Sequence, residues 1–274
     1  MVLLTAPFDP NRTGRALRLP RTGLVATIAS LSVLSAGVLM WYSGGVARDL
    51  GRGIASGAAH SMLLFAGWVI AGGSSACLAL VIYAAAILCL ASIATTFTVW
   101  GALLYLAPLV ILAYHGNRHA NLRGIGLTVT AGVRSIALGF ATGTFLGVHL
   151  LISASLTFGY VVRVSSIGPY LAAVAYDVGA NALTAEWLFR GAVFSHCWQR
   201  WDFWPAASLA TALAVSRYLA DPALPQTIEV RTGAVFYLAL LGFTACALRA
   251  RAGSLLPGYL ATVVFFAAYR MLEQ

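Results

Sequence analysis

The sequence predicts an all-α integral membrane protein, a polytopic bundle of roughly eight or nine transmembrane helices. Hydrophobic residues make up 60% of the 274 positions and charged residues only 9%, whereas in soluble domains about a quarter of the residues are charged. A run of 65 residues, 53–117, contains no Asp, Glu, Lys or Arg. At about 1.5 Å per residue, such a run can cross a bilayer core of about 30 Å three times.

The charges fit the loops of a membrane protein. All 17 basic residues are arginine, and with eight acids they give a net charge of +9. These arginines are scattered singly, without the basic cluster and interleaved aromatics of a nucleic-acid surface, so no nucleic-acid partner is expected. Arg12, Arg15, Arg18 and Arg21 precede the first apolar run, and the positive-inside rule therefore predicts a cytoplasmic N-terminus.

Apolar runs between polar loops predict the individual spans. They lie near residues 23–42, 54–71, 75–94, 98–114, 134–158, 170–195, 203–219, 232–248 and 254–271. Pro108 is expected to kink the fourth span. The segment 196–205 contains three tryptophans around Arg200 and Asp202, which is typical of a membrane-interface belt. We therefore expect a cytoplasmic segment (1–22), N-terminal transmembrane helices (23–119) and a C-terminal transmembrane domain (120–274).

The C-terminal half places four ionisable side chains at membrane depth: Asp177, Glu186, Arg190 and Arg217. Each costs roughly 2.5–3.5 kcal/mol at the centre of a membrane helix, so each should face protein and have a partner. Glu186 and Arg190 stand four residues apart with the acid first, the orientation that favours a pair. Asp177, Asn181 and Thr184 form a second polar face. This pattern fits a buried site, and it equally fits polar contacts between helices.

Three stretches carry a family resemblance: "AEWLFRG" (185–191), "LAVSRYL" (213–219) and "RARAGSLLPGYLATVVFF" (249–266). Together they resemble the CAAX protease and bacteriocin-processing (Abi) family, membrane peptidases that include the type II CAAX prenyl endopeptidases. The resemblance covers about residues 125–272. It implies a CAAX protease-like domain within 120–274 and a location in a bacterial cytoplasmic membrane.

The family motifs are only partly kept. In the first, E-E-x-x-x-R, Glu186 and Arg190 match the second glutamate and the arginine, while Ala185 stands at the first glutamate. In the second, F-x-x-x-H, Leu213 and Arg217 replace both residues. In the third motif, H-x-x-x-N, Thr262 stands at the histidine and Phe266 at the asparagine.

The resemblance assigns water activation to the first glutamate and the two histidines, which bind metal in an older view, and oxyanion stabilisation to the asparagine. This sequence keeps none of the four. Arg217 stays protonated and cannot act as a base. We expect no metal or cofactor, and we expect Arg217 to pair with Glu186 or Asp177 in the vacated site.

These residues favour a non-catalytic relative that acts as a membrane scaffold or partner-binding subunit. Its partner would be another membrane protein or a membrane-bound peptide, held in the lateral groove that the relatives use for cleavage. One alternative is an active intramembrane endopeptidase with a diverged site around Glu186. A second alternative is a small transporter or permease subunit, for which Asp177 and Asn181 are the best argument.

The remaining histidines and cysteines give weaker signals. His115 and His119 form H-x-x-x-H in a stretch that resembles a loop, and a solvated pair is favoured over a metal site. His60 and His149 are expected to hydrogen-bond within the bundle. A dyad of the adjacent His196 and Cys197 is not expected. Four widely spaced cysteines without a C-x-x-C pair imply neither disulfides nor zinc.

Overall fold

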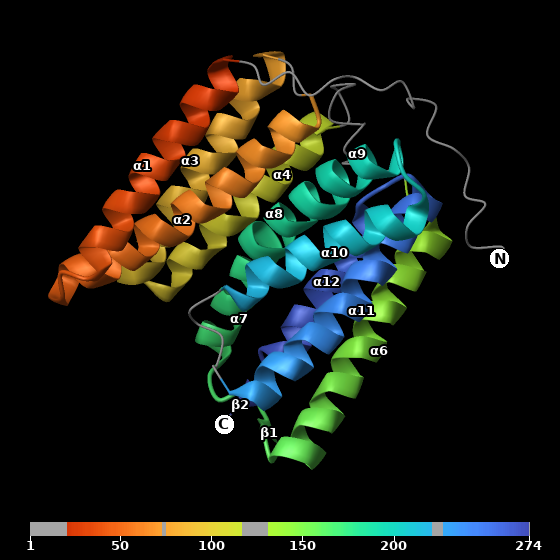
Figure 1. Cartoon of the computed structure of the whole chain (residues 1–274). Coiled ribbons are helices and arrows are strands. Elements are labelled where there is room, and N and C mark those ends of the chain that lie inside the picture. Colours follow the sequence, from red (N-terminus) through yellow and green to blue (C-terminus); the bar gives the residue numbers. More distant parts are fainter. Residues whose placement is uncertain (1–20, 73–74, 117–130, 221–226, 274) are drawn as a thin grey trace. The chain divides into compact units, whose positions relative to one another are not determined.

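The computed structural model describes residues 21–72, 75–116, 131–220 and 227–273 (Figure 1). Apart from one pair of two-residue strands, the regular elements of these residues are helices, which confirms the predicted all-α class. The chain divides into two compact units. The N-terminal unit consists of the described parts of Arg15–Arg123 and Val164–Leu188, and the C-terminal unit of those of Gly124–Arg163 and Phe189–Gln274. The predicted domain 120–274 thus contributes residues to both units.

The first elements of the N-terminal unit are α1 (Arg21–Trp41), α2 (Gly45–Ile70), α3 (Ser75–Phe97), the 3₁₀ helix η1 (Val99–Tyr105) and α4 (Leu106–Gly116). Figure 1 shows α1, α2 and α3 side by side, with α2 in contact with both others. Small residues on α2 permit this close packing. A Cβ atom on Gly57 would lie 2.6 Å from the Cα atom of Cys89 on α3. The α2 helix is therefore the central helix of this group.

The fourth predicted span changes helix type along its length. Thr98 caps η1, because its side chain accepts a hydrogen bond from the backbone N–H of Trp100 at 3.4 Å. Pro108 lies in the first turn of α4, where a missing backbone N–H is tolerated. The change from 3₁₀ to α geometry thus precedes Pro108.

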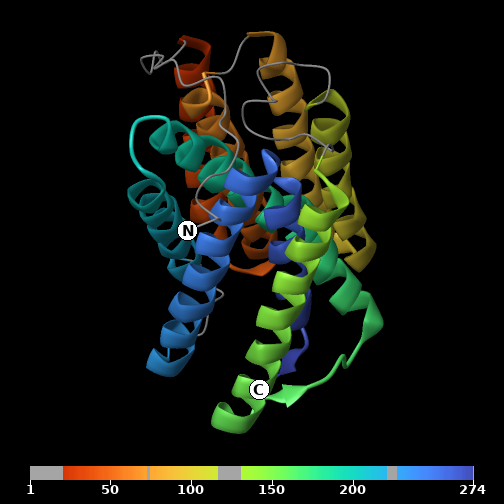
Figure 2. The same ribbon diagram turned by 90° about the vertical axis from the view of Figure 1, so that its right-hand side faces the viewer.

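The C-terminal unit contains α6 (Val133–Phe158), α9 (Ser195–Trp198), α10 (Phe203–Leu219), α11 (Ile228–Ala252) and α12 (Leu256–Tyr269). Helix α6 packs closely on α12, since a Cβ atom on Gly143 would lie 2.5 Å from the carbonyl oxygen of Ala261. After α6, strand β1 (Val161–Val162) pairs antiparallel with β2 (Leu272–Glu273), beside the C-terminus in Figure 2. This strand pair was not predicted.

In the part of the chain that the structure describes, four helices are long and apolar enough to cross a membrane: Gly45–Ile70, Leu78–Phe97, Val133–Phe158 and Ile228–Ala252. Three shorter apolar helices accompany them: Ile28–Trp41, Val99–Tyr114 and Leu256–Tyr269. Large apolar side chains are exposed along α6, including Phe140, Phe145 and Leu156, and a surface of this kind is suited to lipid. The chain is an integral membrane protein, and the predicted total of eight or nine crossings stays a prediction.

The segment that carries the first motif alternates between helix types. It consists of α7 (Ile167–Tyr176), the π-helix η2 (Asp177–Ala182), α8 (Leu183–Ala185), the π-helix η3 (Glu186–Phe194) and α9. A π-helix bonds each residue to the fifth along the chain, is rare, and occurs often at functional sites. The predicted span 170–195 is helical, but its π geometry was not predicted. Both π segments begin at an acidic residue of the predicted site.

Candidate functional site

The kept part of the first motif is buried where α8 meets η3. Ala185 ends α8 and Glu186 begins η3, and they are 0% and 2% exposed. Arg190, four residues further on, is 3% exposed, and Asp177 at the start of η2 is 1% exposed. The burial predicted from the insertion cost of these charges is therefore confirmed for Asp177, Glu186 and Arg190.

Within the N-terminal unit, the second polar face forms a hydrogen-bond network. Asn181 Nδ2 donates to Asp177 Oδ1 at 2.9 Å. Thr184 Oγ1 donates to the carbonyl oxygen of Ala180 at 2.8 Å. His60 of α2 reaches this face, with Nδ1 3.1 Å from Thr184 Oγ1 and Nε2 2.9 Å from the hydroxyl of Tyr176. The network ties α2 to α7 and α8.

The tautomer of His60 follows from this geometry. The single hydroxyl proton of Thr184 goes to Ala180, so Thr184 Oγ1 accepts from His60 Nδ1–H. The other ring nitrogen, Nε2, is then the partner of the Tyr176 hydroxyl. His60 is 3% exposed, which confirms the expectation that it hydrogen-bonds within the bundle. Its partners could not be read from the sequence, because they lie more than a hundred residues away.

Trp187, the residue after Glu186, makes a second contact with α2 within the N-terminal unit. Trp187 is fully buried, and its Nε1–H donates to the carbonyl oxygen of Leu64 at 3.0 Å. Gly67, one turn along α2, lies directly against the indole ring. A larger side chain on Gly67 would collide with the ring. The Trp187 contact therefore holds the start of η3 against α2.

Within the C-terminal unit, Arg190 lies beside the contact between α10 and α11. A Cβ atom built on Gly242 of α11 would be 3.1 Å from Arg190 Nη2, 2.6 Å from Thr211 Cγ2 and 2.9 Å from Thr211 Oγ1. Gly242 thus leaves the space that the guanidinium and the threonine fill. Ser195 Oγ donates to the carbonyl oxygen of Arg190 at 3.3 Å, a bond across five residues that suits the π geometry of η3. Sequence reasoning missed both Thr211 and Gly242.

The replaced positions of the second and third motifs meet through an aromatic side chain of the C-terminal unit. Arg217 lies in the last turn of α10, and its guanidinium carbon is 4.5 Å from the centre of the Tyr218 ring. The Tyr218 ring in turn packs on Phe266 of α12, at 5.3 Å between centroids. Phe266 also contacts Phe265 and Tyr269. An arginine–aromatic stack thus includes both Arg217 and Phe266.

The structure distributes the predicted site over both units. Asp177, Asn181 and Glu186 belong to the N-terminal unit, and Arg190 and Arg217 to the C-terminal unit. Arg217 is half-buried, whereas the other three charged groups are buried. The expected pairing of Arg217 with Glu186 or Asp177 stays a prediction.

The motif positions limit the chemistry of this region. Peptide hydrolysis needs a base that activates water and donors or a metal at the oxyanion. Ala185 and Phe266 offer no polar side-chain atom, and Thr262, 2% exposed on α12, has a hydroxyl in place of an imidazole. Across the described residues, no group of three or more His, Cys, Asp and Glu side chains is placed to hold a metal ion.

The turn between α9 and α10 carries the predicted interface belt. Arg200 Nη1 is hydrogen-bonded to His196 Nε2. Burial lowers the pKa of His196, and the positive charge of Arg200 lowers it further. Burial raises the pKa of the Cys197 thiol. A shared proton is therefore not favoured in this His–Cys pair.

The other sequence candidates have separate outcomes. His149 Nδ1 is 2.7 Å from the hydroxyl of Tyr237, so the expected hydrogen bond within the bundle is confirmed. The pair of His115 and His119 lies outside the residues whose side chains the structure describes. Among the described residues, Cys89, Cys197 and Cys246 form no disulfide.

The comparisons with known proteins concern this same region. A family model described as type II CAAX prenyl endopeptidase Rce1-like matches residues 167–267, from the first residue of α7 into the last turns of α12. No curated protein and no solved structure matches the chain. The matched range contains every position of the three motifs. Residues 167–267 are therefore a CAAX protease-like segment, which confirms the resemblance to this family.

Proposed function

We propose that the protein is a non-catalytic relative of the CAAX-type membrane endopeptidases and acts as a membrane scaffold or partner-binding subunit. Its partner is another membrane protein or a membrane-bound peptide, the class of molecule that the peptidases of this family receive from the bilayer. The observation that carries the proposal is the replacement at the four catalytic positions of the family by Ala185, Arg217, Thr262 and Phe266.

The contacts of these side chains support the proposal. Arg217 stacks on Tyr218, and Phe266 packs among aromatic rings where the family has an oxyanion donor. A guanidinium remains protonated at any pH at which proteins fold, so it cannot replace a histidine base. Glu186 is the one acid left at a motif position, and a single carboxylate supplies neither the second proton carrier nor the oxyanion donors that amide cleavage requires.

We further propose that the chain crosses a bacterial cytoplasmic membrane eight or nine times, with its N-terminus in the cytoplasm. Seven apolar helices of 14 to 26 residues, together with α10 and the helical segment from α7 to α9, support this number among the described residues, because short helices can cross a locally thinned region of the bilayer. The arginines ahead of α1 support the orientation.

Cleavage and partner binding separate the proposal from the endopeptidase alternative. Purified protein in detergent or nanodiscs is incubated with prenylated and bacteriocin-type peptides, beside the variant Glu186→Gln. We expect no cleavage above a protein-free control. Cleavage that Glu186→Gln abolishes would overturn the proposal. In parallel, crosslinking in native membranes should yield one dominant partner band, and its absence would count equally against a scaffold role.

A further inference from the structure

His149 is an exposed imidazole near the middle of α6, a helix long enough to cross a membrane. At 1.5 Å per residue, it lies about 24 Å from the start of α6 at Val133 and about 14 Å from its end at Phe158. Its neighbours Phe145 and Ile152 are exposed apolar side chains. The ring therefore lies at the depth of the lipid acyl chains, which offer no hydrogen-bond partner.

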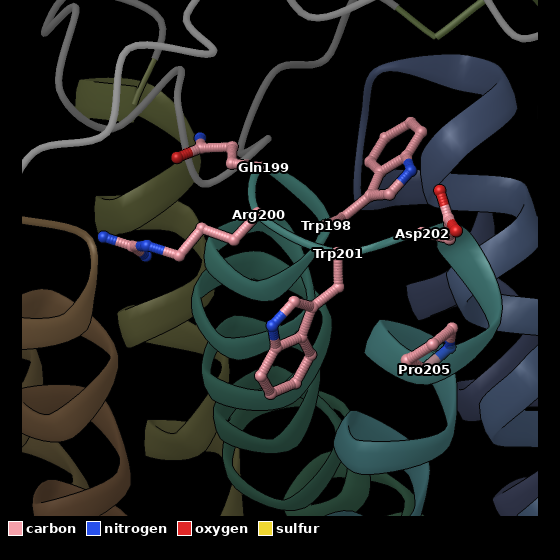
Figure 3. Close-up of a pocket in the computed structure, with 6 residues that line it drawn as sticks. All are labelled: Trp198, Gln199, Arg200, Trp201, Asp202 and Pro205. Carbon is pink, nitrogen blue, oxygen red and sulfur yellow. The ribbon is translucent and has the colours of Figure 1, made fainter.

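Polar and aromatic segments lie at both ends of the C-terminal unit. The turn between α9 and α10, which carries Trp198, Trp201 and Asp202 (Figure 3), lies toward the end of the unit where α6 begins, and strand β1 lies at the opposite end (Figure 1). Tryptophans beside charged residues are typical of the water–lipid interface. The short side chain of His149 cannot extend from the middle of α6 to such an interface, as a long arginine or lysine side chain near a helix end can.

One ring nitrogen of His149 already has partners within the C-terminal unit. Nδ1 is 2.7 Å from the hydroxyl of Tyr237 on α11 and 3.3 Å from Ser153 Oγ. Tyr237 is buried, so these contacts hold Nδ1 toward the inside of the unit. The other nitrogen, Nε2, has no hydrogen-bond partner among the residues that the structure describes.

The surroundings of Nε2 limit what can bind it. A polar atom without a partner is costly in hydrocarbon, so Nε2 needs a partner from outside the chain. Depending on the tautomer, Nε2 is a donor or an acceptor, and a side-chain amide fits both because it has an oxygen acceptor and two N–H donors. A second copy of α6 offers no amide, since residues 146–152 contain no polar side chain besides His149. Asn181, the one asparagine that the structure describes, is buried.

We infer that the face of α6 around His149 binds a transmembrane helix of another protein, which carries an asparagine or glutamine at mid-membrane depth. The amide bonds Nε2, and the exposed side chains of Phe145, Val148 and Ile152 pack against the partner helix. Polar side chains of this kind join helices within membranes. The inference rests on the proposed partner-binding function and adds to it the docking face and the chemistry of the partner.

Synthetic transmembrane helices test the hydrogen bond. Three peptides share a leucine–alanine core and carry asparagine at the midpoint, leucine at the midpoint, or asparagine near one end. Their binding to the full-length protein is measured by fluorescence energy transfer in phosphatidylcholine vesicles. We expect the peptide with the central asparagine to bind roughly three- to thirtyfold more tightly than the one with leucine, the range found for hydrogen bonds between membrane helices. The peptide with the terminal asparagine should bind like the leucine peptide.

Variants of α6 assign this preference to the imidazole. His149→Leu should abolish it, while His149→Gln, which keeps a hydrogen-bonding group, should retain a preference for the central asparagine. The matched control is Ile152→Ala on the same face, which should weaken the binding of both peptides and leave their ratio unchanged. Because His149 is exposed, its variants should keep the helix content of the parent, which circular dichroism checks. Equal binding of the two peptides by the parent, or an unchanged ratio in His149→Leu, overturns the inference.

A photo-crosslinker distinguishes failure of this inference from failure of the proposed function. In native membranes, a crosslinker at Val148 should give the partner band, whereas one at Tyr83, an exposed residue of α3, should give none. A partner band from Tyr83 alone keeps the scaffold role and overturns this docking face. A band of twice the protein's own mass from Val148 identifies a second copy and also overturns it. Selective binding of the central asparagine without any native partner band supports the face and counts against the scaffold role.

Discussion

The sharpest structural prediction concerns Gly242, where α11 leaves room for the guanidinium of Arg190. In Gly242→Ala the new methyl group would lie 2.6 Å from Thr211 Cγ2 and 3.1 Å from Arg190 Nη2. The first separation is far inside van der Waals contact, so α10 and α11 must move apart or the threonine must leave its position. Overpacking of this kind costs about 1–3 kcal/mol.

Helix propensity acts in the opposite direction. Replacing a glycine by alanine in a helix interior gains about 0.5–1 kcal/mol. We therefore expect Gly242→Ala to lower the free energy of unfolding by up to about 2.5 kcal/mol, and by about 1–3 kcal/mol relative to a Gly→Ala change that meets no neighbouring atom. The control is Gly233→Ala on the same helix, where nothing lies within 4 Å of the added methyl group. That variant should be neutral or slightly more stable.

Unfolding in mixed micelles, followed by circular dichroism against the mole fraction of denaturing detergent, measures both variants. The double variant Gly242→Ala with Thr211→Ala removes the two closest atoms and should recover most of the loss. A coupling energy of about 1 kcal/mol or more between the two sites is expected. If Gly242→Ala unfolds at the same detergent fraction as Gly233→Ala, the packing of Arg190 against α11 is wrong.

Three further outcomes are expected. Thr184→Val should lower the free energy of unfolding by about 1–3 kcal/mol, because it leaves the Nδ1–H of His60 buried without its acceptor, while Thr184→Ser should be close to the parent. The pKa of His196 is lowered in the folded protein, so below about pH 6.5 this imidazole takes up a proton in the unfolded chain while it stays neutral in the folded one. The protein's resistance to denaturing detergent should therefore fall as the pH drops below that value. The fall should be weaker in His196→Gln. If Arg217 pairs with Glu186, the substitutions Glu186→Arg and Arg217→Glu should each reduce the yield of folded protein, and the double variant should restore it. If the double variant restores nothing, and the corresponding exchange of Asp177 and Arg217 restores nothing either, the expected pairing does not exist.

Local signals were enough to predict several helices. The predicted spans 134–158 and 203–219 correspond to Val133–Phe158 and Phe203–Leu219. Gly159 ends α6 in the left-handed conformation, with φ of 70°. Glycine adopts this conformation without strain. Asp202 precedes α10 as its N-cap residue. Such signals lie within a few residues of the helix end, so a single sequence contains them.

Other features depend on residues far apart in the chain. The π segments η2 and η3 each begin at an acidic residue within an apolar stretch, but an acidic residue does not by itself specify a change from α to π geometry. The acceptor of the Trp187 indole is a backbone carbonyl on α2, and the space beside Arg190 is a missing Cβ on α11. Each of these features arises from which helix faces meet, and hydrophobic periodicity alone does not specify that in a chain with apolar residues on all sides.

For the site, the insertion cost of a charge was the most informative signal. It correctly predicted burial of Asp177, Glu186 and Arg190. It was less informative for Arg217, which lies in the last turn of α10, is half-buried and stacks on Tyr218. A long side chain near a helix end can place its charge toward the interface while its aliphatic part stays buried. Position within the helix therefore matters as much as residue type.

The partial loss of the first motif has a physical explanation under the proposed function. Ala185 occupies a site with no exposed surface, where an unused carboxylate would need a partner in a medium of low polarity. The next residues have structural uses that catalysis does not require. The indole N–H of Trp187 donates a hydrogen bond to α2. The guanidinium of Arg190 fills the space at Gly242, and the carbonyl oxygen of Arg190 accepts a hydrogen bond from the Ser195 hydroxyl. Loss of the base therefore leaves the helix contacts intact, whereas loss of Arg190 would open a cavity between helices. A chain released from the demand for hydrolysis can lose the first glutamate while the following residues remain necessary for folding.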